Sequence, residues 1–236
     1  MRAQDQGCVV AGVGALAAAA FALAGGLAPA LAAILVAGLG LALARFAALR
    51  APAPLSPTLG WALLLPRGRH GRRAVISFLR PRPGQRVLEI GSGPGAHTLR
   101  IARELAPGGS IVAVDLQRAM LRSLARRVRS AGLPNVRPVR ADARHIPCAD
   151  GRFDAVLMIA ALGEIPRHRS AVGEAARVLR PGGRLIVGET LLDPDHVPLR
   201  RLLDATHGLH LRLEEVRGSR FSYLTAFERT RDVRSR

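Results

Sequence analysis

The hydrophobic and polar positions divide the chain into two unlike parts. From Val9 to Ala44 no side chain is charged or strongly polar. Beyond residue 84, short apolar runs alternate with segments whose apolar residues recur every three or four positions. Such alternation is typical of strands and helices that follow one another, whereas an unbroken apolar run is typical of a membrane segment or a buried helix. The pattern therefore predicts an apolar N-terminal segment followed by an α/β domain.

Five short segments, four of them mainly apolar, predict the strands of one sheet. The run Phe153–Ile159 is apolar almost throughout, which is typical of a strand buried on both faces. Periodic segments between the runs predict connecting helices. The expected strands are residues 86–90, 111–115, 136–141, 153–159 and 185–187, and the expected helices are residues 97–105, 117–130 and 167–179. Repeated strand–helix units predict a doubly wound, mostly parallel sheet.

The last part of the chain has a period of two. Apolar residues occupy alternate positions from Leu209 to Leu213 and again from Phe221 to Phe227, and Gly218-Ser219 lies between the two segments. Two alternating runs separated by a glycine predict a β-hairpin. We expect this C-terminal hairpin to be antiparallel and to close one edge of the sheet.

The N-terminal apolar run is too long for one straight span. As a single helix it would measure about 54 Å, whereas the hydrocarbon core of a bilayer is about 30 Å thick. Gly25-Gly26 and Pro29 stand midway and predict a turn. We therefore expect a transmembrane helical hairpin with arms Val9–Ala24 and Leu27–Ala44. A single tilted span, a signal peptide and a buried pair of soluble helices are the alternatives, although the run exceeds the apolar core of a signal peptide.

The charge of the chain is strongly positive, at +18, and every basic residue is arginine. Without lysine there can be no Schiff-base lysine and no Walker or kinase lysine. Arginines crowd the segment from Arg45 to Arg86, and no acid occurs between Asp5 and Glu89. By the positive-inside tendency we expect the domain to lie on the cytoplasmic side, and its basic surface suits a membrane with anionic lipid.

Two other ligand classes fit the composition poorly. One Trp, one Tyr and six Phe provide few platforms for base stacking, which argues against a nucleic-acid partner. The only cysteines, Cys8 and Cys148, form no Cys-x-x-Cys pair, and the histidines form no His-Glu-x-x-His pattern. The sequence therefore predicts neither a disulfide framework nor a metal site.

A glycine-rich loop follows the first expected strand. Glycines at 91, 93 and 95 let the backbone approach a ligand and let the next helix begin tightly. Asp115 ends the second strand, where a carboxylate can accept both hydroxyls of a ribose. Gly91-x-Gly93-x-x-Ala96 also fits the dinucleotide fingerprint. These residues by themselves leave a nicotinamide and an adenosyl cofactor equally open.

Later motifs resemble a known family. The blocks, in order, are Val87-Leu88-Glu89-Ile90-Gly91-Ser92-Gly93-Pro94-Gly95, Val114-Asp115-Leu116, Ala141-Asp142-Ala143, Phe153-Asp154-Ala155-Val156 and Arg177-Val178-Leu179-Arg180-Pro181-Gly182-Gly183. In this order and spacing they resemble the class I S-adenosylmethionine-dependent methyltransferases, of the type that includes quinone and small-lipid methylases. The resemblance covers about residues 84–190 and implies a Rossmann-like fold whose last strand is antiparallel.

The resemblance implies a cofactor site, residue by residue. Glu89, Gly91, Ser92, Gly93 and Gly95 would surround the methionine part of S-adenosylmethionine. Asp115 would hold the ribose, and Leu116 would lie beside the adenine. Asp142 would accept from the adenine amino group next to the Ala143 backbone, and the backbone near Ile159 and Ala160 would meet the methionine amine. Glu89 and Asp142 as mere caps of local turns are the alternative.

The residues that act on the methyl acceptor are less defined. Glu164 follows the fourth strand, where the acceptor should lie, and is the leading candidate for a catalytic base. A helix cap or a surface position is the alternative for Glu164. Weaker candidates are His97, His145, His168 and Tyr223.

The order of segments predicts three parts with different tasks. These are a membrane anchor at 1–45, a basic, Pro-rich link with a cover helix at 46–83, and a methyltransferase domain at 84–230. An anchor next to the expected active site favours a lipid or lipophilic acceptor, such as a quinone, over a soluble small molecule. A nicotinamide-dependent oxidoreductase and a non-catalytic membrane scaffold are the competing functions.

Overall fold

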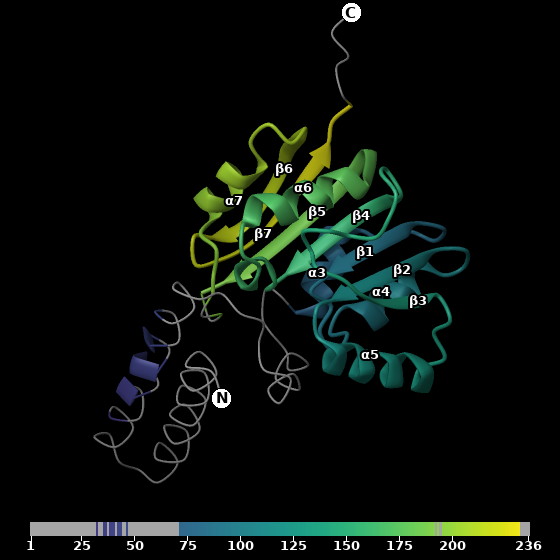
Figure 1. Cartoon of the computed structure of the whole chain (residues 1–236), viewed down its shortest axis with the longest axis horizontal. Helices are drawn as coiled ribbons and strands as arrows, with labels where there is room; N and C mark the ends of the chain where they lie inside the picture. Colours follow the sequence, from purple (N-terminus) through teal and green to yellow (C-terminus); the bar gives the residue numbers. More distant parts are fainter. Residues whose placement is uncertain are drawn as a thin grey trace, which may run out of the picture.

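The computed structural model describes residues 71–191, 193 and 195–231, with scattered helical positions between 32 and 46. A seven-stranded sheet in the order β3-β2-β1-β4-β5-β7-β6 forms its centre (Figure 1). The first five strands pair in parallel, and β7 pairs antiparallel with both β5 and β6. The predicted sheet and its antiparallel C-terminal hairpin are therefore confirmed.

Most of the elements agree with the expected ranges to within a residue or two. The strands are β1 (Arg86–Ile90), β2 (Ser110–Asp115), β3 (Val136–Arg140), β4 (Phe153–Ile159), β5 (Leu179–Thr190), β6 (Leu211–Ser219) and β7 (Ser222–Arg229). The helices are α3 (Arg72–Leu79), α4 (Thr98–Leu105), α5 (Arg118–Ser130), α6 (His168–Val178) and α7 (Leu199–Thr206), with the short 3-10 turn η3 (Leu162–Glu164).

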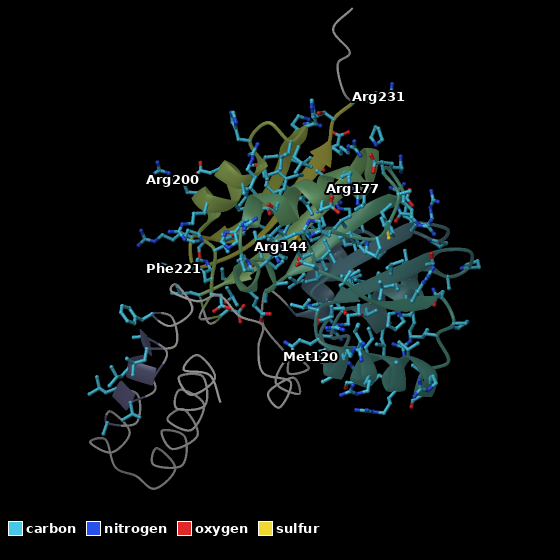
Figure 2. The ribbon with its side chains drawn as sticks, in the orientation of Figure 1. Met120, Arg144, Arg177, Arg200, Phe221 and Arg231 are labelled. Atoms are coloured by element: carbon cyan, nitrogen blue, oxygen red, sulfur yellow. The ribbon has the colours of Figure 1, made fainter. Side chains whose placement is uncertain are left out.

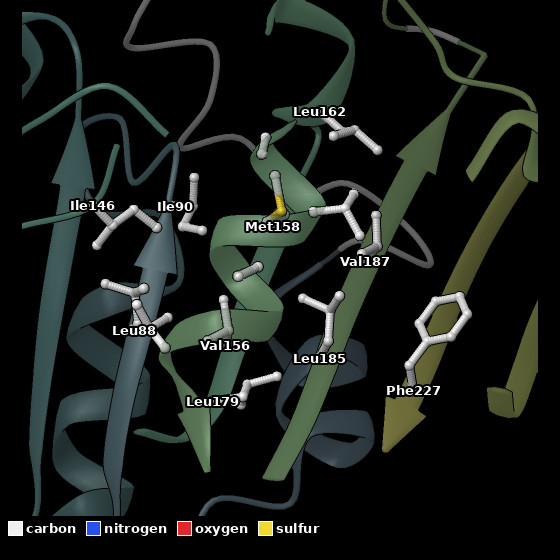
Figure 3. Packing of buried hydrophobic residues seen from close by; sticks show 14 of the residues in the cluster. Leu88, Ile90, Ile146, Val156, Met158, Leu162, Leu179, Leu185, Val187 and Phe227 are labelled. Carbon is white, nitrogen blue, oxygen red and sulfur yellow. The ribbon is translucent and has the colours of Figure 1, made fainter. Parts of the chain in front are cut away.

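Helices cover both faces of the sheet and create two cores. On one face α6 and α7 bury Val172, Val178 and Leu202 against the sheet. Figure 3 shows this core around Leu88, Val156, Met158, Leu185 and Val187. On the other face α3, α4 and α5 bury Phe78, Ile101 and Leu124 against the sheet residues of opposite parity. Because successive side chains of a strand point to opposite faces, a central strand buried on both sides is apolar at most of its positions.

Two local expectations were wrong, and one helix was missed. The fifth strand, expected at residues 185–187, already begins at Leu179, so Pro181-Gly182-Gly183 lies inside β5, where the register with β4 shifts. The hairpin turns at Arg220-Phe221, since Gly218 is still paired with Tyr223. Helix α7 was not predicted.

The predicted membrane arms, Val9–Ala24 and Leu27–Ala44, lie almost entirely outside the described residues. At the described positions between 32 and 46 the chain is helical. No helix in the described part of the chain is both long and apolar enough to cross a bilayer.

Candidate active site

The glycine-rich loop leaves β1 in a conformation that glycine favours. Gly91, Gly93 and Gly95 have φ values of 71°, 52° and 85°. A Cβ atom added to Gly91 would lie 2.4 Å from the Cβ of Ala161, so the loop and the segment after β4 touch at this point. Both the positive φ and the close approach exclude a larger residue at 91.

The amides of this loop are used within the protein. Gly91 and Ser92 donate to the carbonyl of Val114 at 2.9 and 3.0 Å. Gly93 donates to the Oδ2 of Asp115 at 2.8 Å, and Gly95 donates to the carbonyl of Ser92 at 2.9 Å. Dinucleotide-binding loops instead direct such groups at a pyrophosphate. These four amides are thus used inside the protein and are not available to a phosphate group.

Asp115 joins the loop to the end of β2. Besides the bond from Gly93, its Oδ1 accepts from the backbone N–H of Gln117 at 2.8 Å. Burial raises the pKa of the Asp115 carboxyl, and these backbone donors oppose that effect. The backbone N–H of Leu116 is a third donor to this carboxylate. A carboxylate can accept about four hydrogen bonds, so Asp115 has acceptor capacity left for a ribose hydroxyl.

Glu89 lies under the loop and is 3% exposed. Its Oε2 accepts a hydrogen bond from the hydroxyl of Thr98 at the start of α4. Burial raises the pKa of Glu89 to about 8, an effect that the Thr98 bond opposes and the nearby Asp115 increases. The Glu89 carboxyl group beside the loop is therefore mostly neutral at pH 7.

Ser92 supplies a polar atom that faces the same region. Its Oγ is buried and has no hydrogen-bond partner among the described residues. Buried polar atoms are nearly always paired, so a ligand group that pairs with this oxygen fits the site. The loop of glycines, the remaining acceptor capacity of Asp115 and this oxygen together fit the methionine and ribose parts of S-adenosylmethionine.

Asp142 lies at the other end of the site and carries a partner that the sequence did not suggest. The Nη2 of Arg144 approaches the Oδ2 of Asp142 at 2.6 Å, and the Nε approaches both carboxylate oxygens at about 3 Å. The Arg144 guanidinium lowers the pKa of Asp142 to about 2. Asp142 is thus ionised at neutral pH, and both of its carboxylate oxygens already accept hydrogen bonds from Arg144.

Two adjoining hollows open at the carboxyl ends of the strands. Both are lined by Gly91, Asp115, Ala161 and Glu164. The first hollow continues past residues on the β2 and β3 side, namely Leu116, Ala141, Asp142, Ala143 and Arg144. The second continues past Glu89, Ser92, Gly93, His97, Ile159, Ala160 and Thr190. Apart from Gly95, which lies behind the loop against Leu124, every expected cofactor residue therefore lines these hollows.

The candidate bases differ in their access to the hollows. Glu164 lines both, and His97 lines the second. Tyr223 is buried and donates its hydroxyl to the carbonyl of Val197 at 2.7 Å, and His168 lies at the start of α6. None of the other three candidates, Tyr223, His145 and His168, lines one of the hollows. The geometry leaves Glu164 as the leading candidate.

Side chains that the sequence did not suggest hold the site together. Arg127 of α5 donates to the carbonyls of Pro94 and Gly95, the latter at 3.2 Å, and so fixes the far end of the loop. Thr98 and Arg144 bind the two acids described above. Of these three residues, only Thr98 could have been recognised from the sequence, because it stands at the expected start of the helix, nine residues after Glu89.

Comparison with known proteins agrees with this geometry. A family model described as "Methyltransferase domain" matches residues 87–183. The ubiquinone/menaquinone biosynthesis C-methyltransferase UbiE of Vibrio cholerae is 33% identical over 141 residues, which are 59% of this chain and 54% of that protein.

Solved structures share the fold. The SAM dependent methyltransferase from Aquifex aeolicus has a TM-score of 0.68 at 18% identity and covers 75% of this chain and 100% of its own. The [4+2]-cyclase SpnF has a TM-score of 0.59 at 20% identity and covers 67% of this chain and 80% of its own. Such low identities establish the architecture, and one architecture hosts different reactions.

The chain spans between 34% and 58% of the length of the curated relatives that it matches. The matched segment contains the glycine-rich loop, Asp115 and Asp142, which together form the hollows. The cofactor of this domain is S-adenosylmethionine. By its matched segment, its strand order and its loop, the chain carries a methyltransferase domain of the class I S-adenosylmethionine-dependent family.

Proposed function

We propose that the protein transfers a methyl group from S-adenosylmethionine to a lipophilic small molecule of quinone-like chemistry at a membrane. The observation that carries the methyltransferase part is the loop whose amides are satisfied by Val114, Asp115 and Ser92. This arrangement disfavours the nicotinamide alternative because it aims none of these donors at a pyrophosphate.

The described residues divide the binding of the cofactor among them. Asp115 would accept the ribose hydroxyls, and Asp142 would accept from the adenine amino group while Arg144 keeps it ionised. Glu89 and Ser92 would lie beside the methionine part. When bound, S-adenosylmethionine supplies a methyl group on a positively charged sulfur, so the protein needs mainly to align the acceptor and exclude water.

Glu164 would serve the acceptor. It lines both hollows, at the wall formed by the segment after β4. An acceptor carbon or oxygen that gains a methyl group must lose a proton, and a carboxylate at this wall can take that proton. Where the acceptor is already ionised, Glu164 would only orient it.

Two observations support a lipophilic acceptor. Several of the curated relatives are ubiquinone/menaquinone biosynthesis C-methyltransferases. In this chain the domain follows an apolar run, and the described helical positions there expose Leu35, Val36, Leu39, Leu43 and Phe46 at helical spacing. We propose that this run is a helical hairpin in the membrane and that the domain lies on the cytoplasmic side.

The test is methyl transfer from radiolabelled cofactor into extracted membrane lipids by the full chain. Label in the lipid fraction that is lost with Asp115→Ala supports the proposal, and label only in water-soluble products refutes the lipophilic acceptor. Cofactor binding without any transfer would favour the non-catalytic scaffold, and tight binding of NADH alone would favour the oxidoreductase. Carbonate extraction and proteolysis from the outer face of intact cells test the anchor and its orientation.

A further inference from the structure

The two helical layers of the domain differ in charge. Helices α3, α4 and α5 contain nine arginines and a single acid, Glu104. Helices α6 and α7 contain four arginines and two acids, Glu174 and Asp204. Glu104 is moreover paired with Arg100 of the same helix at 2.6 Å. Positive charge is therefore concentrated on one face of the sheet.

Four of these arginines form a line along α5, here named the α5 arginine stripe. Its members are Arg118, Arg122, Arg126 and Arg129, and all four are exposed. Their spacing of three and four residues puts them on one side of the helix, opposite the buried Leu124 and Val128. Figure 2 shows nitrogen-tipped side chains along the outer side of α5.

No described carboxylate pairs with the stripe, and α5 itself contains no acid. Like charges three or four residues apart lower the stability of a helix. The neighbouring Arg127 differs because it points inward to the carbonyls of Pro94 and Gly95. The stripe therefore has no role in holding the fold together, and it suits an external anionic surface.

The residues around the α5 arginine stripe indicate which kind of anionic surface it would bind. Phe78, the only aromatic residue of α3, α4 and α5, is fully buried, so this face offers no ring for stacking with a nucleic-acid base. The chain enters the layer at α3 directly from the arginine-rich segment that follows the apolar run. Clusters of arginine next to a membrane segment are attracted to anionic headgroups.

We propose that the outer face of α4 and α5 docks on an anionic lipid surface through the α5 arginine stripe. This inference rests on the membrane association in the proposed function and adds the surface that makes the contact. Helix α5 begins three residues after Asp115, and the exposed Leu116 between them lines the first hollow. Docking by α5 therefore places the rim of the cofactor hollow next to the lipid.

The experiment measures the labelling of one cysteine on each helical layer. Ser130 ends α5 and Ser170 lies on α6, and both are exposed. Each is replaced by cysteine in the full chain from which Cys8 and Cys148 have been changed to serine. The chain is incorporated into vesicles of phosphatidylcholine alone or with about 30% phosphatidylserine, and the rate of modification by a bulky maleimide is measured.

We expect phosphatidylserine to slow labelling at 130 by about tenfold, with full recovery in high salt, because exposed charges are screened within a Debye length. Labelling at 170 should not change. Changing Arg118, Arg122, Arg126 and Arg129 to glutamine should abolish the protection. The matched control changes Arg152, Arg167, Arg200 and Arg201, which are exposed elsewhere, and should retain it.

Other outcomes overturn the inference. Equal rates at 130 on both vesicles, or protection that survives the stripe variant, exclude docking through α5. Protection of 130 by a DNA duplex but not by phosphatidylserine would make the face a nucleic-acid surface instead. Binding of S-adenosylmethionine is measured on every variant, and it reports on folding and on the cofactor site. The docking inference and the proposed function can therefore fail independently of each other.

Discussion

The hydroxyl of Thr98 donates to the buried carboxyl group of Glu89, and this bond joins the start of α4 to the end of β1 beneath the cofactor loop. Both groups are almost fully buried. Desolvation outweighs the hydrogen bond, so Glu89 keeps its proton at neutral pH. A carboxyl group whose pKa is raised in the folded state makes folding depend on pH in a defined direction.

Glu89 should make the protein less stable as the pH rises. Its folded pKa of about 8 exceeds the ordinary value of 4.5. The folded state therefore holds the proton more tightly, and stability falls from about pH 4.5 to about pH 8. At about 1.4 kcal/mol per pH unit the full effect is on the order of 5 kcal/mol. Glu89→Gln should remove this slope in urea unfolding followed across the range. A wild-type curve parallel to that of the variant would contradict the assignment.

Asp115→Ala should weaken the binding of S-adenosylmethionine by about 1.5 to 3 kcal/mol, because charge-assisted hydrogen bonding to the ribose is lost. Loss of the acceptor for Gly93 will also loosen the loop. Titration calorimetry measures the change, and Asp204→Ala, at an exposed position of α7, is the control. Unchanged affinity in Asp115→Ala would remove Asp115 from the cofactor site.

Gly91→Ala should abolish cofactor binding and lower the free energy of unfolding by about 1 to 3 kcal/mol, because it causes backbone strain and overpacking. The added methyl would meet Ala161 at 2.4 Å. Gly132→Ala is the matched control, because Gly132 has a positive φ of 60° and nothing within 4 Å of the added carbon. If both substitutions have the same effect, strain alone explains them and the contact with Ala161 is unimportant. Restored binding in Gly91→Ala, Ala161→Gly would confirm the contact.

Arg127→Met should raise the Kd for S-adenosylmethionine by about three- to tenfold, because it removes the hydrogen bonds that hold the loop carbonyls. Arg126→Met changes the same charge on the exposed side of the same helix and should leave the Kd as it is. Two equal responses would mean that net charge, and not the loop contact, controls the affinity.

The sequence was sufficient for those features that short segments determine. The strands β1, β2 and β4 are short and mainly apolar runs. Glu89 lies within β1, Asp115 ends β2, and Asp142 lies two residues after the end of β3. The hairpin was predicted from its period, but its turn was displaced because a glycine is equally compatible with a paired position inside a strand. At Gly218 the strands approach so closely that an added carbon would lie 2.1 Å from the carbonyl of Ser222.

One of the missed contacts joins residues that are distant in sequence. Arg127 reaches the loop 32 residues earlier, and nothing near it on α5 distinguishes it from the exposed arginines around it. Arg144 was missed for another reason, since an arginine two residues after an acid is unremarkable until both lie at a hollow. Helix α7 carries an apolar period, but its eight residues follow a proline and are too short to be recognised with certainty.

The position of β7 between β5 and β6 determines when the sheet can be completed during synthesis. β6 leaves the ribosome before β7, but its sheet partner is β7 itself. Until residues 222–229 have been made, the edge of β5 lacks its neighbour and β6 has no strand to join. An unpaired edge of this kind invites association with other chains. Strands β6 and β7 can therefore join the sheet only after residues 222–229 have been made.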